Sequence, residues 1–182
     1  MLPVKNEYKK YLLLIPLLAF SFSRASGQYD LDRPSLAIRA EDGLPNHYFR
    51  GLAMDANGFI WAGSYDGLAR FDGRRIKTFF HQADDSSGLA HSAIASLVTT
   101  PDDVNVWVGT YGGLSVYDAV SGRFHSYYQD ATDSTALRSN FIDWVYADRQ
   151  GGVWVASGSE VLTHYKPATD GFAHYHPKAA NA

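Results

Sequence analysis

The chain of 182 residues contains no cysteine. Disulfide bonds are therefore excluded, as is a lipid anchor on an N-terminal cysteine, so packing alone must hold the fold together. An excess of positive charge is also absent, because the formal net charge is -3. The basic surface that nucleic-acid binding requires is therefore missing. The chain does have 46% hydrophobic and 14% aromatic residues, which is enough for the core of one ordinary domain.

Long hydrophobic runs are scarce too, and the one candidate lies at the N-terminus. Three lysines within the first ten residues precede an apolar run at 11–22, and mostly small residues follow at 23–27. This order is typical of a secretory signal peptide, and about 12 apolar residues are fewer than the roughly 20 that a membrane-spanning helix needs. We therefore predict a Sec-type signal peptide at 1–27, cleaved between Ala25 and Gln28, and a periplasmic location. An uncleaved N-terminal anchor is the alternative.

One sequence pattern occurs three times after this segment. It reads FIWAGSYDGL at 59–68, NVWVGTYGGL at 105–114 and GVWVASGSEV at 152–161. Its tryptophans are Trp61, Trp107 and Trp154, so the period is 46 and then 47 residues. A period of this length indicates a repeat architecture.

Each repeat predicts four antiparallel strands. The tryptophan strand is second and is apolar at consecutive positions, which predicts that both of its faces are covered. Asp66-Gly67 and Gly112-Gly113 follow it and are typical of two-residue hairpin turns with positive φ at both central residues. We expect the repeat core to consist of the tryptophans and the residues that open the third strands: Trp61, Trp107, Trp154, Leu68, Leu114 and Val161.

A four-stranded unit of this kind cannot bury itself and must stack on similar units, which predicts an all-β fold of propeller blades. The segment 36–38 has the place of an outer strand that closes another blade. Three blades do not close a ring, because closed propellers have about 4 to 8. We therefore predict an incomplete ring in an N-terminal fragment of a longer protein; self-assembly of identical chains is the alternative.

The expected organisation has six parts. They are a signal peptide at 1–27, a lead-in with the closing strand at 28–42, blades at 43–87, 88–135 and 136–176, and a tail at 177–182.

The repeats resemble the two-component regulator propeller repeat, found in the periplasmic sensor region of bacterial hybrid histidine kinases. The resemblance rests on Gly43-Leu44-Pro45, on 55–64 and on 66–73, and it covers roughly residues 36 to 176. The third repeat departs from the pattern, with Ala156 where glycine is usual.

The resemblance implies a noncatalytic sensor that binds a small-molecule or carbohydrate ligand outside the inner membrane. It also implies further propeller, membrane and kinase regions as partners, and an inner-membrane anchor and homodimer for the full-length receptor. Related receptors use a diguanylate cyclase as output. The alternative function is an exported propeller enzyme, a lyase or hydrolase.

The residues themselves predict no catalytic site, cofactor or metal. His174 and His176 project from one strand face, but a zinc site needs three or four ligands. The tryptophans are expected in the core. We place the candidate ligand contacts on the hairpin turn where the repeats differ, at Tyr65, Asp66 and Tyr111, because loops on a rigid scaffold often hold binding residues.

Overall fold

The computed structural model describes residues 38, 40–101, 104–158 and 161–176. The predicted signal peptide, the C-terminal tail and most of the predicted closing strand lie outside these residues. Of that strand only Ile38 is described, and it belongs to no strand; a short 3-10 turn follows at Ala40–Asp42. Within the described residues no helix is long and apolar enough to cross a membrane.

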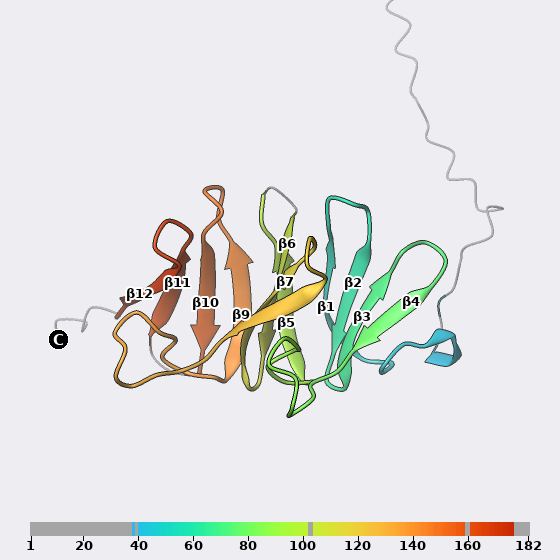
Figure 1. The fold of residues 1–182 in the computed structure, drawn as a ribbon, viewed down its shortest axis with the longest axis horizontal. Helices are drawn as coiled ribbons and strands as arrows, with labels where there is room; N and C mark the ends of the chain where they lie inside the picture. Colours follow the sequence, from blue (N-terminus) through green and yellow to red (C-terminus); the bar gives the residue numbers. More distant parts are fainter. Residues whose placement is uncertain (1–37, 39, 102–103, 159–160, 177–182) are drawn as a thin grey trace, which may run out of the picture. The chain divides into compact units, whose positions relative to one another are not determined.

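Three four-stranded antiparallel sheets make up the described fold (Figure 1). Blade 1 contains β1 (Phe49–Met54), β2 (Ile60–Ser64), β3 (Gly67–Phe71) and β4 (Ile76–Phe79). Blade 2 contains β5 (Ile94–Thr99), β6 (Asn105–Thr110), β7 (Gly113–Asp118) and β8 (Arg123–Tyr127). Blade 3 contains β9 (Ile142–Ala147), β10 (Val153–Ser157), β11 (Leu162–Lys166) and β12 (Gly171–Tyr175). The predicted fold class, three antiparallel propeller blades without a closed ring, is confirmed.

The first strands of the blades are the innermost ones. β1 contacts β5, and β5 contacts β9, whereas β4, β8 and β12 lie at the outer edges of their sheets. The segments 80–93 and 128–141 return from an outer strand to the next inner strand. They lie at the same end of the blades as the β2–β3 and β6–β7 hairpins, which we call the connection end, at the bottom of Figure 1.

Each interface between blades has the same construction. The tryptophan face of one blade packs on the opposite face of the next, so the core forms two clusters. Trp61 and Leu68 of blade 1 share the first cluster with Val106, Val108 and Tyr117 of blade 2. Trp107 and Leu114 of blade 2 share the second with Val153, Val155 and Phe172 of blade 3.

Glycine is required where the inner strand of the next blade comes closest. A Cβ atom at Gly63 would lie 2.6 Å from Ile94 Cγ2, and one at Gly109 would lie 2.7 Å from Ile142 Cγ2. Ala156 holds the same position in blade 3, whose tryptophan face meets no further blade within the described residues.

The predicted hairpin geometry needs correction. Ser64 pairs with Gly67, so the loop residues are Tyr65 and Asp66. Asp66 does not have positive φ, whereas Gly67, which opens β3, has a φ of 154°. Positive φ thus occurs at the first strand residue after the turn instead of at both turn residues.

Val161 is not the counterpart of Leu68 and Leu114. Leu162 pairs with Tyr175 in the way that Leu68 pairs with Phe79, so Leu162 holds that position. The reason is a hairpin one residue longer in blade 3, where Trp154 pairs with His164, ten residues on, while Trp61 pairs with Arg70, nine residues on. Trp61 and Trp107 are buried, but Trp154 is only half-buried, because no further blade covers its face within the described residues.

Candidate functional site

The hairpins at the connection end are held by a buried hydroxyl in each of the first two blades. Ser64 Oγ donates to the Gly67 carbonyl at 2.9 Å, and Thr110 Oγ1 donates to the Gly113 carbonyl at 2.7 Å. Both side chains are fully buried. Because these bonds fix the turns, the residues at the tips are presented on a rigid support.

Aromatic residues from the three blades follow one another at this end. The Tyr65 and Tyr111 hydroxyl oxygens lie 3.4 Å apart, and their ring centroids are 5.8 Å apart. Tyr111 stacks in turn on Phe141, with centroids 4.1 Å apart and an interplanar angle of 18°. Tyr65 is 40% exposed and Phe141 44% exposed. We call these three residues the aromatic row.

Charged and polar side chains flank the aromatic row at its blade 1 end. The Arg50 guanidinium lies 5.0 Å from the centroid of the Tyr65 ring, within cation–π range. Asn46 Nδ2 donates a hydrogen bond to Asp66 Oδ2. The hydrogen bond to Tyr65 raises the pKa of the Tyr111 hydroxyl above its ordinary value, so this phenol stays protonated at neutral pH.

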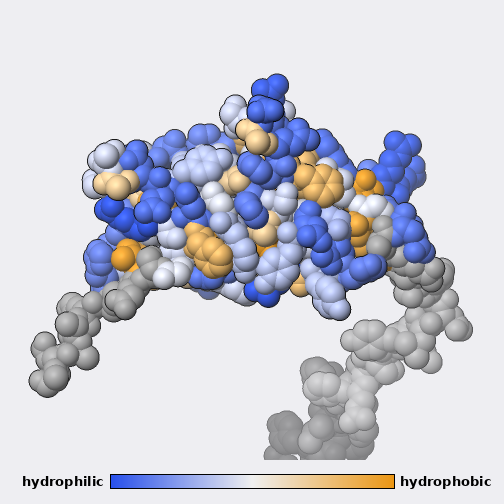
Figure 2. All heavy atoms as spheres, turned by 90° about the horizontal axis from the view of Figure 1, so that it is seen from below, coloured by the Kyte–Doolittle hydropathy of each residue, from blue (hydrophilic) through white to orange (hydrophobic). Residues whose placement is uncertain are grey.

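All three predicted ligand contacts therefore lie on the same surface. Tyr65 and Tyr111 meet directly, while Asp66 stands beside Tyr65 and bonds Asn46. Figure 2 looks onto this end and shows apolar patches between hydrophilic side chains. Sequence reasoning missed Arg50 and Phe141. Arg50 lies on β1, and Phe141 stands directly before β9. No spacing in the sequence links either residue to the hairpin tips.

The aromatic row can bind but offers no evident catalytic chemistry. Exposed rings with phenol hydroxyls and neighbouring Arg50 and Asp66 provide apolar faces and directional hydrogen bonds, the combination that fixes small ligands in binding sites. The described residues contain no group of three or more metal-ligating side chains. His174 bonds Thr163 Oγ1 at 3.2 Å and the Ser134 carbonyl at 3.1 Å, so both of its ring nitrogens already have partners.

Comparisons with known proteins place this geometry in context. A family model described as "Two component regulator propeller" matches residues 43–66, which run from the start of blade 1 to Asp66. The extracellular domain of BT3049 from B. thetaiotaomicron, described as a hybrid two component system, is 26% identical with a TM-score of 0.71. The match covers 77% of this chain and 20% of that one.

Two further solved structures share the fold. The extracellular domain of BT4673 from B. thetaiotaomicron, also described as a hybrid two component system, is 24% identical over 70% of this chain and 17% of that one, with a TM-score of 0.56. Virginiamycin B lyase from Staphylococcus aureus is 14% identical over 75% of this chain and 44% of that one, with a TM-score of 0.53. The search of curated proteins gave no match.

The chain spans about a fifth of the length of the extracellular domain of BT3049. The sheet topology and the likeness to the extracellular domain of BT3049 agree on the architecture. The chain is thus built of β-propeller blades, and the two component regulator propeller model matches residues 43–66 in the first of them.

Proposed function

We propose that the chain is the noncatalytic, ligand-sensing propeller portion of an extracytoplasmic receptor in a two-component system. The observation that supports this most is its likeness to the extracellular domain of BT3049, described as a hybrid two component system, over 77% of the chain. In this proposal the regions that transmit the signal belong to the rest of the receptor. The likeness to virginiamycin B lyase is in the fold alone and gives no support to a lyase activity.

The aromatic row is the proposed contact for the ligand, and an oligosaccharide is the proposed ligand class. Sugar rings have apolar C–H faces that can lie on the exposed ring of Tyr65, and hydroxyl groups that can bond phenol hydroxyls and carboxylates. Tyr65 and Tyr111 supply two neighbouring hydroxyls, and Asp66 supplies acceptor oxygens at the edge. Neutral oligosaccharides need this mixture of stacking and hydrogen bonding.

Calorimetric titration of the chain with a panel of neutral oligosaccharides tests this proposal. We expect binding by at least one of them, and we expect Tyr65→Ala combined with Tyr111→Ala to weaken it by about tenfold or more, because a few aromatic contacts dominate such sites.

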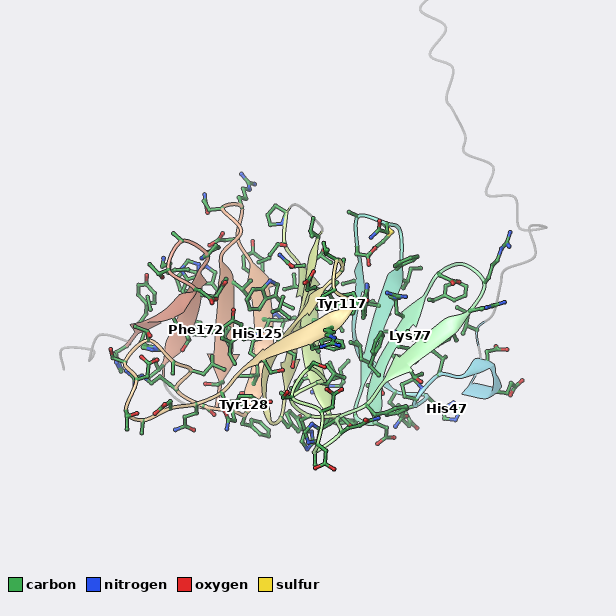
Figure 3. All side chains as sticks on the ribbon, viewed as in Figure 1. His47, Lys77, Tyr117, His125, Tyr128 and Phe172 are labelled. Carbon is green, nitrogen blue, oxygen red and sulfur yellow. The ribbon has the colours of Figure 1, made fainter. Side chains whose placement is uncertain are left out.

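Tyr128→Ala is the matched control. Tyr128 is an exposed tyrosine at the same end of the blades, but it lies outside the aromatic row (Figure 3). The control should bind as the unaltered chain does. Loss of binding in both variants, or in neither, would contradict the assignment of the row, and the absence of binding to every oligosaccharide would contradict the proposed ligand class.

A location outside the cytoplasm is part of the proposal, and the predicted signal peptide supports it. N-terminal sequencing of the chain after expression in a Gram-negative host should find a mature end between Ser26 and Gln28 in the periplasmic fraction. An intact Met1 in the cytoplasmic fraction would contradict the predicted export.

A further inference from the structure

The outer rims of the two blade interfaces differ in their polar residues. The strand register makes Phe124 the counterpart of Phe172, because they pair with Tyr117 and Tyr165 respectively. Gly122 and Asp170 stand two residues earlier in each case. Both have positive φ, 69° and 47°, so the same turn is built with glycine at one interface and aspartate at the other.

The interface between blades 2 and 3 contains its own carboxylate. Asp170 Oδ1 accepts a hydrogen bond from the Tyr127 hydroxyl at 2.6 Å and from the Tyr165 hydroxyl at 2.9 Å. These two hydrogen bonds lower the pKa of Asp170, so the group is a carboxylate at neutral pH. This carboxylate fills the rim of the interface.

Of the three groups in this arrangement, the interface between blades 1 and 2 keeps only Tyr117, the counterpart of Tyr165. Gly122 replaces the aspartate, and Phe79, which has no hydroxyl, holds the position of Tyr127. A Cβ atom at Gly122 would lie 3.7 Å from the Tyr117 hydroxyl. That oxygen accepts a bond from Arg70 Nη1 at 3.0 Å, and no acceptor for its proton is found among the described residues.

A hollow of about 240 Å³ opens at this place. Residues of β4, of the connection after it and of the start of β8 line it, among them Lys77, Phe79, Phe80, Gly122, Arg123 and Phe124. Phe79 and Phe124 meet edge to face with centroids 5.3 Å apart. Phe80 is 48% exposed, so the hollow has an accessible apolar wall.

The hollow also has an excess of positive charge. Lys77 Nζ lies 4.8 Å from the centroid of the Phe79 ring, and Arg123 lines the same space. Figure 3 labels Lys77 and Tyr117 of this interface, together with His125 and Phe172 of the interface between blades 2 and 3. His125 is the counterpart of Lys77, because it pairs with Val116 as Lys77 pairs with Arg70.

One acid, Asp85, lies at the edge of the hollow. Its carboxylate accepts bonds from the Ser87 amide at 2.9 Å and the Ser87 hydroxyl at 2.7 Å. Asp133 and Thr135 repeat the same turn in the next connection, so this acid belongs to the connection and does not replace Asp170. The pKa of Asp85 is lowered by its hydrogen bonds to Ser87 and, to a smaller extent, by the charge of Arg123. Lys77 has no ion pair within the part of the chain that is described.

We propose that this hollow binds a small ring compound with a carboxylate, such as a hexuronic acid or benzoic acid. The ligand carboxylate lies beside Gly122, at the turn where the next interface has Asp170. There it pairs with Lys77 and Arg123, while its ring lies against Phe80. A volume of about 240 Å³ is below the usual range for drug-sized ligands and fits a single ring. This site is distinct from the aromatic row.

Calorimetric titration of the chain with sodium galacturonate, sodium benzoate and neutral galactose tests the proposal. We expect at least one carboxylate to bind and galactose to bind about tenfold more weakly or not at all, because charge-assisted bonds supply the selectivity. Binding of galacturonate alone assigns the ligand to sugar acids, and binding of benzoate alone assigns it to aromatic acids. Equal binding of galactose, or no binding of either carboxylate, would overturn the proposal.

The combined variant Gly122→Asp with Phe79→Tyr copies the rim of the second interface into the first. Asp170 shows that aspartate adopts this turn, so the variant should fold, and its own carboxylate should abolish carboxylate binding. Gly151→Asp is the control: Gly151 has a φ of 81° and open space around it, and it lies in blade 3. Unchanged binding in the combined variant would refute the site.

A second variant keeps the test decisive if the first one unfolds. Lys77→Gln with Arg123→Gln replaces two exposed side chains and should weaken carboxylate binding by about tenfold or more. Oligosaccharide binding at the aromatic row should remain. A loss at one site without the other separates a failure of this inference from a failure of the proposed function.

Discussion

Gly109 of β6 provides the sharpest test of how blades 2 and 3 pack. A Cβ atom there would lie 2.7 Å from Ile142 Cγ2 and 3.2 Å from Val145 Cγ1. Ile142 is fully buried and Val145 is 3% exposed, and both belong to the second core cluster. Neither side chain can therefore move aside without disturbing its neighbours. We expect Gly109→Ala to destabilise the fold.

The magnitude follows from two opposing effects. Overpacking a core costs about 1–3 kcal/mol, and a contact below 3.0 Å belongs near the upper end. Replacing glycine by alanine also restricts the unfolded chain, which stabilises the fold by about 0.4–1 kcal/mol. The net loss should be about 2 kcal/mol, which lowers Tm by roughly 4–8 °C for a chain of this size.

Gly158→Ala is the matched control, because the nearest atom to a Cβ there, Phe141 Cδ1, is 4.0 Å away. Urea and thermal unfolding, both followed by circular dichroism, measure the two variants side by side. The control should be as stable as the unaltered chain or slightly more stable. Equal stability of both variants would refute the close approach of β9 to Gly109.

Two other predictions concern buried aromatic and hydroxyl contacts. Trp61→Ala should cost about 3–5 kcal/mol in urea unfolding, and Trp154→Ala clearly less, because Trp61 is fully buried and Trp154 is half-buried; equal costs would contradict the difference in burial. The hydrogen bonds from Tyr127 and Tyr165 lower the pKa of Asp170, so its contribution to stability is present above about pH 4, the unfolded value, and is lost as the pH falls through the lower folded value. The urea midpoint should therefore fall less between pH 5 and pH 3 in Asp170→Asn than in the unaltered chain. An identical fall would show that Asp170 does not contribute to the loss of stability at low pH.

The blade itself could be predicted from the sequence because its determinants are local. Alternating turns and apolar strands fix a four-stranded meander without reference to other blades. Asp55 is an example: it follows β1, and its Oδ1 accepts the amide protons of Asn57 and Phe59 at 2.9 and 3.1 Å, as turn chemistry leads one to expect.

The repeat pattern does not determine the exact strand register of blade 3. An ungapped alignment assigns Val161 to the position of Leu68, but one extra residue in the third hairpin moves Leu162 there. The predicted positive φ at both hairpin turn residues is wrong for a related reason. Dipeptides such as Asp66-Gly67 indicate a turn, but only the strand pairing of Ser64 with Gly67 decides which residues lie inside it.

Only part of the candidate site, too, could be predicted from the sequence. Tyr65 and Tyr111 hold the same position in successive repeats, so stacking of the blades brings them together, and their proximity could be anticipated. Arg50 on β1 and Phe141 just before β9 reach the row only through the way the blades pack. No spacing in the sequence encodes that contact.

The partners of the repeat tryptophans explain why equivalent positions acquire different roles. Asp55 Oδ2 accepts the indole proton of Trp61 at 2.8 Å. In blade 2 Pro101 holds that position, and the indole nitrogen of Trp107 has no hydrogen-bond partner among the described residues. In blade 3 Asp148 Oδ2 instead bonds His164 Nε2 at 2.7 Å. The tryptophan position is the same in all three blades, but the polar contacts around it differ. The residues at the outer edges of the blades can therefore vary while the packing between blades is kept. Functional differences between the two interfaces are therefore to be sought in the residues that the repeat does not conserve along the chain.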